Sequence, residues 1–372
     1  MFKKKLGFLL GVMVLLSLAG YLVCLTAGSN KQLNKGEKFL LVTSFYPMYV
    51  LAENLTAGVE NVTVSNLTEN QTGCLHDYQL FPEDMILLSR ADAFLVNGAG
   101  MELFMEKVIK SNTELPVIET SHGIALLEGV GHHHHEEEDI FESEHESKEE
   151  DINYEPEDTN ELENDSESGN ESVLTEKNHE SEGITHESER EVDEDADSHD
   201  DHAHNHNGHI WMDVERHREQ LSNAAKELQI LLPEQAVALA KAAKAYDEKL
   251  MELAAEAEDL AKHTKGMFVV IFHEAFAYLA ESLDMEVLMA FSLDENNLPS
   301  PGEIAEVIEE INYHGAALIL IEEMYASYAD KILAGTDAQV VYINPLTTGN
   351  GAVDSYLTGM RENLNAIRQV LE

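Results

Sequence analysis

Short apolar segments that alternate with helical patterns restrict the fold of this chain more than any other feature. They occur at 39–43, 62–67, 92–96 and 116–120, and again at 267–272, 285–291, 317–321 and 339–343. Strands that alternate with helices need crossover connections, which produce a mainly parallel sheet. We therefore predict an α/β fold with two lobes, each built on a four-stranded mainly parallel sheet.

A long helical pattern lies between the two groups of strands. After a helix predicted for 214–231, Pro233 starts a run that is rich in Ala, Glu, Lys and Leu and reaches His263 without an internal Gly or Pro. Such a run favours one long helix. The predicted domains are an N-terminal lobe at 38–232, a linking helix at 233–264 and a C-terminal lobe at 265–372.

An acidic, histidine-rich segment interrupts the N-terminal lobe at 131–208. Of the chain's formal charge of -48, the stretch 132–207 carries -27, from 30 Asp and Glu against three Lys and Arg. It also holds eleven of the 18 histidines. This composition cannot bury enough apolar surface to offset the entropy of ordering, so we predict a disordered insertion. The acidic balance argues against nucleic acid as a partner.

The N-terminal segment 1–30 has the layout of an export signal. Three lysines precede an uncharged apolar stretch from Leu6 to about Leu25. A stretch of this length is also able to stay in the bilayer as an anchor, and Cys24 is a candidate for lipid attachment. We expect an extracytoplasmic protein, either tethered to the outer face of the cytoplasmic membrane or released. The only other cysteine is Cys74, so we expect no structural disulfide.

Candidate metal ligands follow several of the predicted strands. In open parallel sheets, ligands bind beyond the carboxyl ends of the strands. His76 follows the second strand after a loop, His273 follows the fifth, and Glu322 and Glu323 both follow the seventh. His209 stands where ordered chain resumes after the insertion. Three imidazoles and one carboxylate suit zinc, with manganese as the alternative that prefers oxygen.

Each candidate also has an ordinary structural explanation. His76 fits an unremarkable loop histidine, and local pattern does not separate Glu322 from Glu323. Asp77 or Asp213 is a candidate for orienting a ligating ring.

The histidines of the insertion are read as a weak metal-collecting arm or, alternatively, as part of a solvating spacer. The segment "HEAFA" begins like a zinc-hydrolase motif, but Ala277 stands where the second histidine would be. The metal-hydrolase hypothesis is therefore disfavoured.

Several motifs carry a resemblance to a known family. In chain order they are "SFYPMYVLAENLTAG", "GCLHDYQLFPEDMILLSRADAFLVNGAGME", "GHIWMD", "FHEAFAYLAE" and "LPSPGEIAEVIEEI". Together they resemble the zinc/manganese-binding solute-binding proteins of ABC importers, and the likeness extends from about Lys38 to the C-terminus. The family's fold is two α/β lobes joined by one long helix, with the metal between the lobes.

This resemblance implies that His76, His209, His273 and Glu322 are the metal ligands. A histidine at 273 and a His-rich loop are typical of the zinc members. The resemblance implies a monomeric receptor that captures Zn²⁺ (alternatively Mn²⁺), delivers it to an ABC permease and catalyses nothing. A metal buffer or adhesin without a transport role is the alternative.

Overall fold

The structure is a computed structural model that describes residues 38–68, 75, 78–129, 206–291 and 299–372. The predicted export and tether segment lies outside the described residues, as do His76, Asp77 and Cys74. Positions 131–205 of the predicted insertion lie outside them as well.

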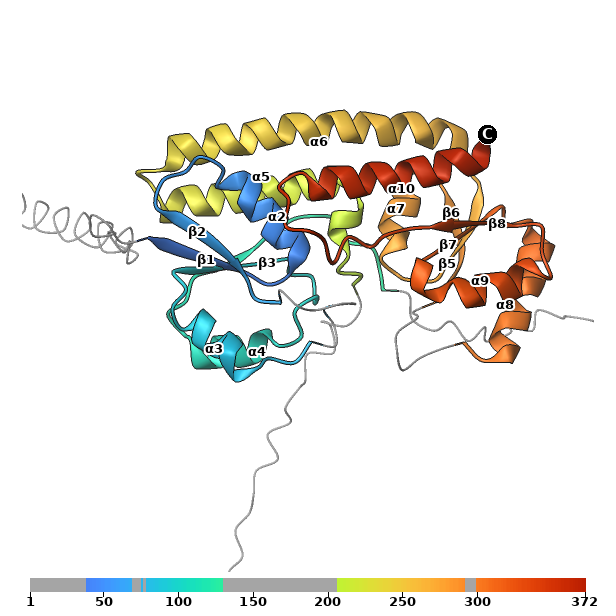
Figure 1. Cartoon of the computed structure of the whole chain (residues 1–372), viewed down its shortest axis with the longest axis horizontal. Helices are drawn as coiled ribbons and strands as arrows, with labels where there is room; N and C mark the ends of the chain where they lie inside the picture. The colour runs from blue at the N-terminus through green and yellow to red at the C-terminus, as the bar shows by residue number, and fades with distance from the viewer. Residues whose placement is uncertain (1–37, 69–74, 76–77, 130–205, 292–298) are drawn as a thin grey trace, which may run out of the picture. The chain divides into compact units, whose positions relative to one another are not determined.

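Both sheets are four-stranded and parallel, as predicted (Figure 1). The first has the order β2-β1-β3-β4 and contains β1 (Phe39–Thr43), β2 (Val62–Asn66), β3 (Ala93–Val96) and β4 (Val117–Glu119). The second has the order β6-β5-β7-β8 and contains β5 (Phe268–Ile271), β6 (Glu286–Ala290), β7 (Leu318–Ile321) and β8 (Gln339–Tyr342). Within each group the first strand in the chain lies between the second and the third. The two sheets therefore repeat one topology.

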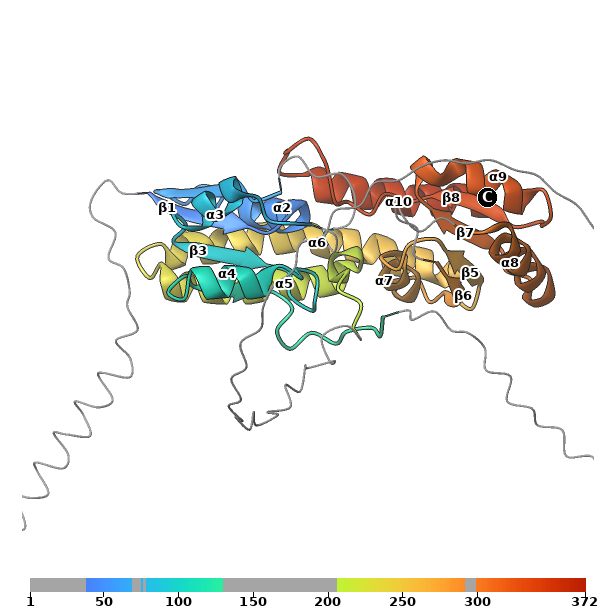
Figure 2. The ribbon, with the colours of Figure 1, turned by 90° about the horizontal axis from the view of Figure 1, so that it is seen from below.

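Helices connect the strands. In the first part of the chain these are α2 (Tyr46–Leu55), α3 (Pro82–Leu88), α4 (Met105–Ser111), the 3₁₀ turn η3 (Ile210–Met212) and α5 (Val214–Leu231). The long α6 (Ala236–Thr264) follows, and then α7 (Phe276–Ser282), α8 (Pro301–His314), the 3₁₀ turn η4 (Glu323–Tyr325), α9 (Ala326–Leu333) and α10 (Ser355–Leu371). α6 packs against α2, α5 and α10, and α5 and α6 lie side by side in both views (Figures 1 and 2).

Local sequence signals explain where several helices begin and end. Asp213 caps α5, because its carboxylate accepts hydrogen bonds from the backbone N–H groups of Glu215 and Arg216. Ser300 and Glu303 form a capping box at the start of α8. That helix ends at Gly315, whose φ of 71° is a left-handed conformation that glycine adopts without strain.

One hydrophobic cluster includes residues of both sheets and of α6. Leu41 of the first sheet, Leu250 of α6 and Val269 of the second sheet all belong to it, and each is fully buried. Val270, the next residue of β5, belongs to a second cluster with residues of α8 and α9. This change follows from the alternation of side chains along a strand. β5 is therefore buried on both faces.

The described residues form a single compact unit by their contacts, so the predicted boundaries between lobes and linking helix remain predictions. The predicted insertion extended to residue 208, but its last three residues belong to the fold. Glu128 and His206 form an antiparallel bridge, and the backbone N–H of Asn207 donates to Leu127 O at 2.9 Å. Asn207 and Gly208 are buried. The described residues before and after the gap at 130–205 are thus held side by side.

Candidate metal centre

The carboxyl ends of β5 and β7 bring two candidate ligands together. These strands are parallel neighbours, with Ile271 opposite Leu320, so the residues that follow them leave the sheet at one edge. His273 Nδ1 lies 3.1 Å from Glu322 Oε1. The imidazole is 7% exposed and the carboxylate 19%. Both groups are therefore largely shielded from water while remaining close to the sheet edge.

Glu322 and Glu323 differ in their surroundings. β7 ends at Ile321 and η4 begins at Glu323, so Glu322 is the single residue between them. Its carboxylate lies beside His273, whereas Glu323 is exposed. Of the two glutamates, the geometry favours Glu322 as a ligand.

His209 reaches the same place from a third segment of the chain. Its ring centroid lies 5.0 Å from that of His273, and the two ring planes are 75° apart. His209 is fully buried. The nearby Trp211 anchors this segment, because its indole N–H donates to Pro345 O at 2.8 Å and its ring packs edge-on against Phe45 at 4.9 Å.

Three of the four predicted ligands therefore lie close together. The fourth, His76, is outside the described part of the chain. Among the described residues, no group of three or more His, Cys, Asp or Glu side chains is placed to hold a metal ion. His209, His273 and Glu322 therefore do not form a metal site by themselves, and the assignment of the four ligands, which includes His76, remains a prediction.

The sequence analysis missed Asn207, whose side chain contacts His209. Asn207 Oδ1 lies 2.9 Å from His209 Nδ1. Asp213, predicted as an alternative for orienting a ligand ring, instead caps α5 and pairs with the Arg216 guanidinium at 2.6 Å. Asn207 stands in a run of His, Asp and Asn that is typical of solvated chain. The one feature of the sequence that could have indicated its role is its position two residues before the candidate ligand His209.

A buried carboxylate lies at the carboxyl edge of the first sheet. Glu102 accepts hydrogen bonds from Ser44 Oγ at 2.7 Å, from Asn97 N at 2.7 Å and from Gly98 N at 3.0 Å. Burial raises the pKa of Glu102 to about 7, although these hydrogen bonds lower it. Asn97 Nδ2 in turn donates to Gly208 O at 2.8 Å. Glu102 therefore supports the loop on which the His209 segment rests.

We expect Glu102→Gln to change how stability depends on pH. The carboxyl titrates near 4.5 when unperturbed and near 7 in the folded protein. The folded state therefore binds more protons between these values, and this group lowers the free energy of unfolding as pH rises through that window. The free energy of unfolding of the variant minus that of the wild type should increase from pH 4.5 to 7. Urea unfolding of the two metal-free proteins at several pH values measures this difference. A difference that stays constant from pH 4.5 to 7 would contradict the raised pKa of Glu102.

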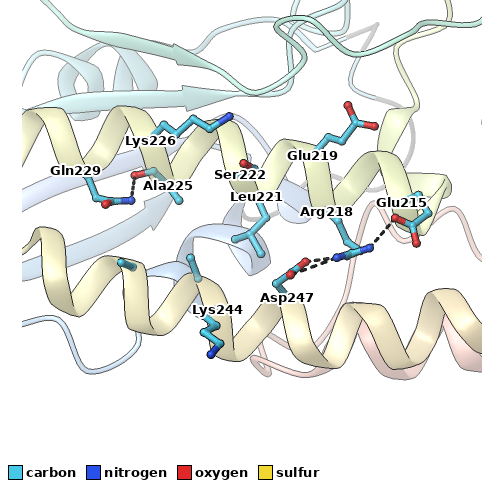
Figure 3. A pocket seen from close by; sticks show the side chains of 12 residues that line it. Glu215, Arg218, Glu219, Leu221, Ser222, Ala225, Lys226, Gln229, Lys244 and Asp247 are labelled. Atoms are coloured by element: carbon cyan, nitrogen blue, oxygen red, sulfur yellow. Dashed lines mark hydrogen bonds and ion pairs between the residues drawn. The ribbon is translucent and has the colours of Figure 1, made fainter.

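A surface groove of about 530 Å³ lies between α5 and α6 (Figure 3). Inside it, Arg218 lies between two carboxylates: its Nε is 2.7 Å from Asp247 Oδ1, and another of its nitrogens is 2.7 Å from Glu215 Oε2. None of the residues that line the groove is a candidate metal ligand. The groove is therefore separate from the candidate metal centre.

Comparisons with known proteins relate the sequence to metal-uptake proteins. The family described as zinc-uptake complex component A, periplasmic (ZnuA) matches residues 41–370. The zinc-binding protein AdcA of Streptococcus pyogenes serotype M3 is 24% identical over 364 residues, which cover 96% of this chain and 61% of that protein. The high-affinity zinc uptake system protein ZnuA of Bacillus subtilis is 24% identical over 382 residues, which cover 100% of this chain and 99% of that protein.

Solved structures share the fold. The solute-binding protein FpvC of Pseudomonas aeruginosa, solved in complex with Mn²⁺, matches with a TM-score of 0.64 and 18% identity, over 90% of this chain and 98% of that one. At this identity the likeness shows the fold alone. The chain spans about 61% of the length of the streptococcal AdcA proteins that it matches.

Proposed function

The chain belongs to the zinc-uptake complex component A family, and we propose on this basis that it is an extracytoplasmic receptor. It captures Zn²⁺ with high affinity and delivers the ion to the membrane permease of an ABC importer. The proposed ligands are His76, His209, His273 and Glu322. Mn²⁺ is the alternative cargo.

The observation that carries this proposal is the convergence of His209, His273 and Glu322 from three separate segments. Three imidazoles and one carboxylate match the nitrogen and oxygen donors that zinc takes in tetrahedral sites. Manganese is harder and prefers more oxygen ligands, so the donor set favours zinc. The ligands must be deprotonated to bind, and the imidazoles of His209 and His273 are buried in the metal-free structure.

A receptor without catalytic activity fits the same set of residues. Four protein ligands close the zinc coordination shell and leave no position for an activated water. Position 277 in α7 is Ala, so the second histidine of a zinc-hydrolase helix is missing. The uptake role of the family agrees with this interpretation.

The proposed location is the outer side of the cytoplasmic membrane. The segment 1–30 serves as export signal or tether in this proposal, with Cys24 as the candidate site of lipid attachment, and the receptor acts as a monomer. Among the described residues, no helix combines the length and the hydropathy needed to cross a bilayer.

The proposal separates a tight site in the fold from a weak arm in the insertion. Replacing residues 132–205 by a short Gly-Ser linker should leave one tight zinc site and lower the number of weakly bound ions, since Glu128 and His206 already adjoin. Competitive zinc and manganese titration of the protein from residue 31, with and without the deletion, measures both. Loss of tight binding when the insertion is removed would instead favour a metal buffer, because ten histidines lie in the stretch 132–205.

A further inference from the structure

Asn207 is a fully buried amide whose side chain makes three polar contacts with described residues. Its Oδ1 accepts the backbone N–H of His209 at 3.0 Å and lies 2.9 Å from His209 Nδ1. Its Nδ2 donates to the backbone carbonyl of Glu274 at 2.8 Å. A buried amide that is satisfied on both sides has one orientation, because a carbonyl oxygen only accepts and a backbone N–H only donates.

This orientation determines which nitrogen of His209 carries the proton. Since Asn207 Oδ1 is an acceptor, the neutral imidazole donates through Nδ1–H. The carboxylate of Glu274, with Oε1 at 3.7 Å from the same nitrogen, favours the same tautomer. His209 Nε2 then carries the lone pair that a metal requires. A ligand histidine whose other nitrogen donates in this way is fixed in both tautomer and orientation.

Asn207 also connects two candidate ligands that are distant in the sequence. Glu274 directly follows His273, so the Nδ2 hydrogen bond ties the segment of His209 to that of His273. Tyr278 of α7 strengthens this connection, because its hydroxyl donates to Asn207 O at 2.7 Å and accepts the N–H of Leu127 at 3.0 Å.

We propose that Asn207 is a positioning residue of the metal site, which sets the His209 tautomer through Oδ1 and holds the His209 and His273 segments together through Nδ2. The predicted effect of Asn207 on zinc affinity rests on the proposed function. The effect of Asn207 on the His209 tautomer is a property of the metal-free protein.

Two substitutions separate the two roles. Asn207→Leu removes the acceptor and the donor while keeping a similar volume. Asn207→Asp keeps an acceptor for His209 but cannot donate to the Glu274 carbonyl. Asn54→Leu is the matched control, since Asn54 is a buried amide that donates to two backbone carbonyls, those of Val50 and Val353, at 2.9 and 2.6 Å.

The first measurement is the tautomer of His209, by long-range ¹⁵N–¹H correlation in the metal-free full chain at pH 8. We expect Nδ1–H in the wild type, in Asn207→Asp and in Asn54→Leu, and a shift toward Nε2–H in Asn207→Leu. An Nε2–H imidazole in the wild type or in Asn207→Asp would overturn the proposal. So would an unchanged Nδ1–H population in Asn207→Leu, and if that variant does not fold, Asn207→Asp carries the test.

The second measurement is competitive zinc titration of the same proteins. Loss of an outer contact to a metal-bound histidine typically costs about 10- to 100-fold in affinity. We expect this loss in Asn207→Leu, a smaller one in Asn207→Asp, and an affinity within about threefold of wild type in Asn54→Leu. Wild-type affinity in Asn207→Leu would overturn the positioning role. Absence of tight zinc binding in the wild type would instead refute the proposed function, and the tautomer would still decide the role of Asn207.

Discussion

His273→Ala is expected to weaken zinc binding by about 100- to 1,000-fold. Structural zinc sites with four protein ligands bind with ~10–16 kcal/mol, so one ligand contributes roughly a quarter of that, or about 2.5–4 kcal/mol. The substitution also removes the imidazole nitrogen that lies 3.1 Å from Glu322 Oε1. Competitive titration with a chromogenic chelator measures the change.

His314→Ala is the matched control for this experiment. His314 Nε2 pairs with Glu310 Oε2 at 3.3 Å on α8, so it is a second histidine with a glutamate partner that is not a candidate ligand. Zinc affinity should stay at the wild-type value in this variant. Equal tight binding by His273→Ala and wild type would place the site elsewhere and contradict the ligand assignment.

Trp211→Ala is expected to lower the free energy of unfolding by ~3–5 kcal/mol. The cost of replacing a large buried aromatic residue by Ala lies in this range, because a cavity remains. Trp211 is fully buried, and its indole also holds Pro345 through a hydrogen bond of 2.8 Å. Urea unfolding followed by circular dichroism is the suitable measurement, since Trp211 is the only tryptophan of the chain.

Trp211→Phe separates the packing of the ring from its hydrogen bond. Phe keeps an aromatic ring beside Phe45 but leaves the Pro345 carbonyl without its donor, so we expect a smaller loss than in Trp211→Ala. The Ala variant should also bind zinc more weakly, because His209 lies in the segment that Trp211 anchors. A loss of stability below ~1 kcal/mol in Trp211→Ala would contradict the anchoring role.

Elements with clear local signals were predicted from the sequence to the residue. β1 occupies 39–43, because its apolar run lies between Lys38 and Ser44. α5 occupies 214–231, because Asp213 provides the cap. Elements without such limits are shorter in the structure than predicted; β4, for example, covers 117–119 where 116–120 was predicted. Local chemistry thus determined where these elements begin and end.

The candidate site was predicted in part. The strand-end rule placed His273 and Glu322 together, because the carboxyl ends of neighbouring parallel strands meet at one edge. It did not separate Glu322 from Glu323, since that depends on the turn after β7. It also missed Asn207, whose burial results from contacts with Leu127, Glu274 and Tyr278. Such tertiary contacts are absent from any local pattern.

Because Glu128 and His206 form a bridge, the fold should tolerate changes in the length of the segment that joins these two residues. When the two ends of a loop are already held together, the entropy of closing it grows only with the logarithm of its length, and each doubling costs about 0.6 kcal/mol. Segments of very different size and composition can therefore occupy this position with little effect on folding. The same tolerance makes the bridge a suitable place to insert a fluorescent domain, whose signal would follow occupancy of the proposed metal site that includes His209.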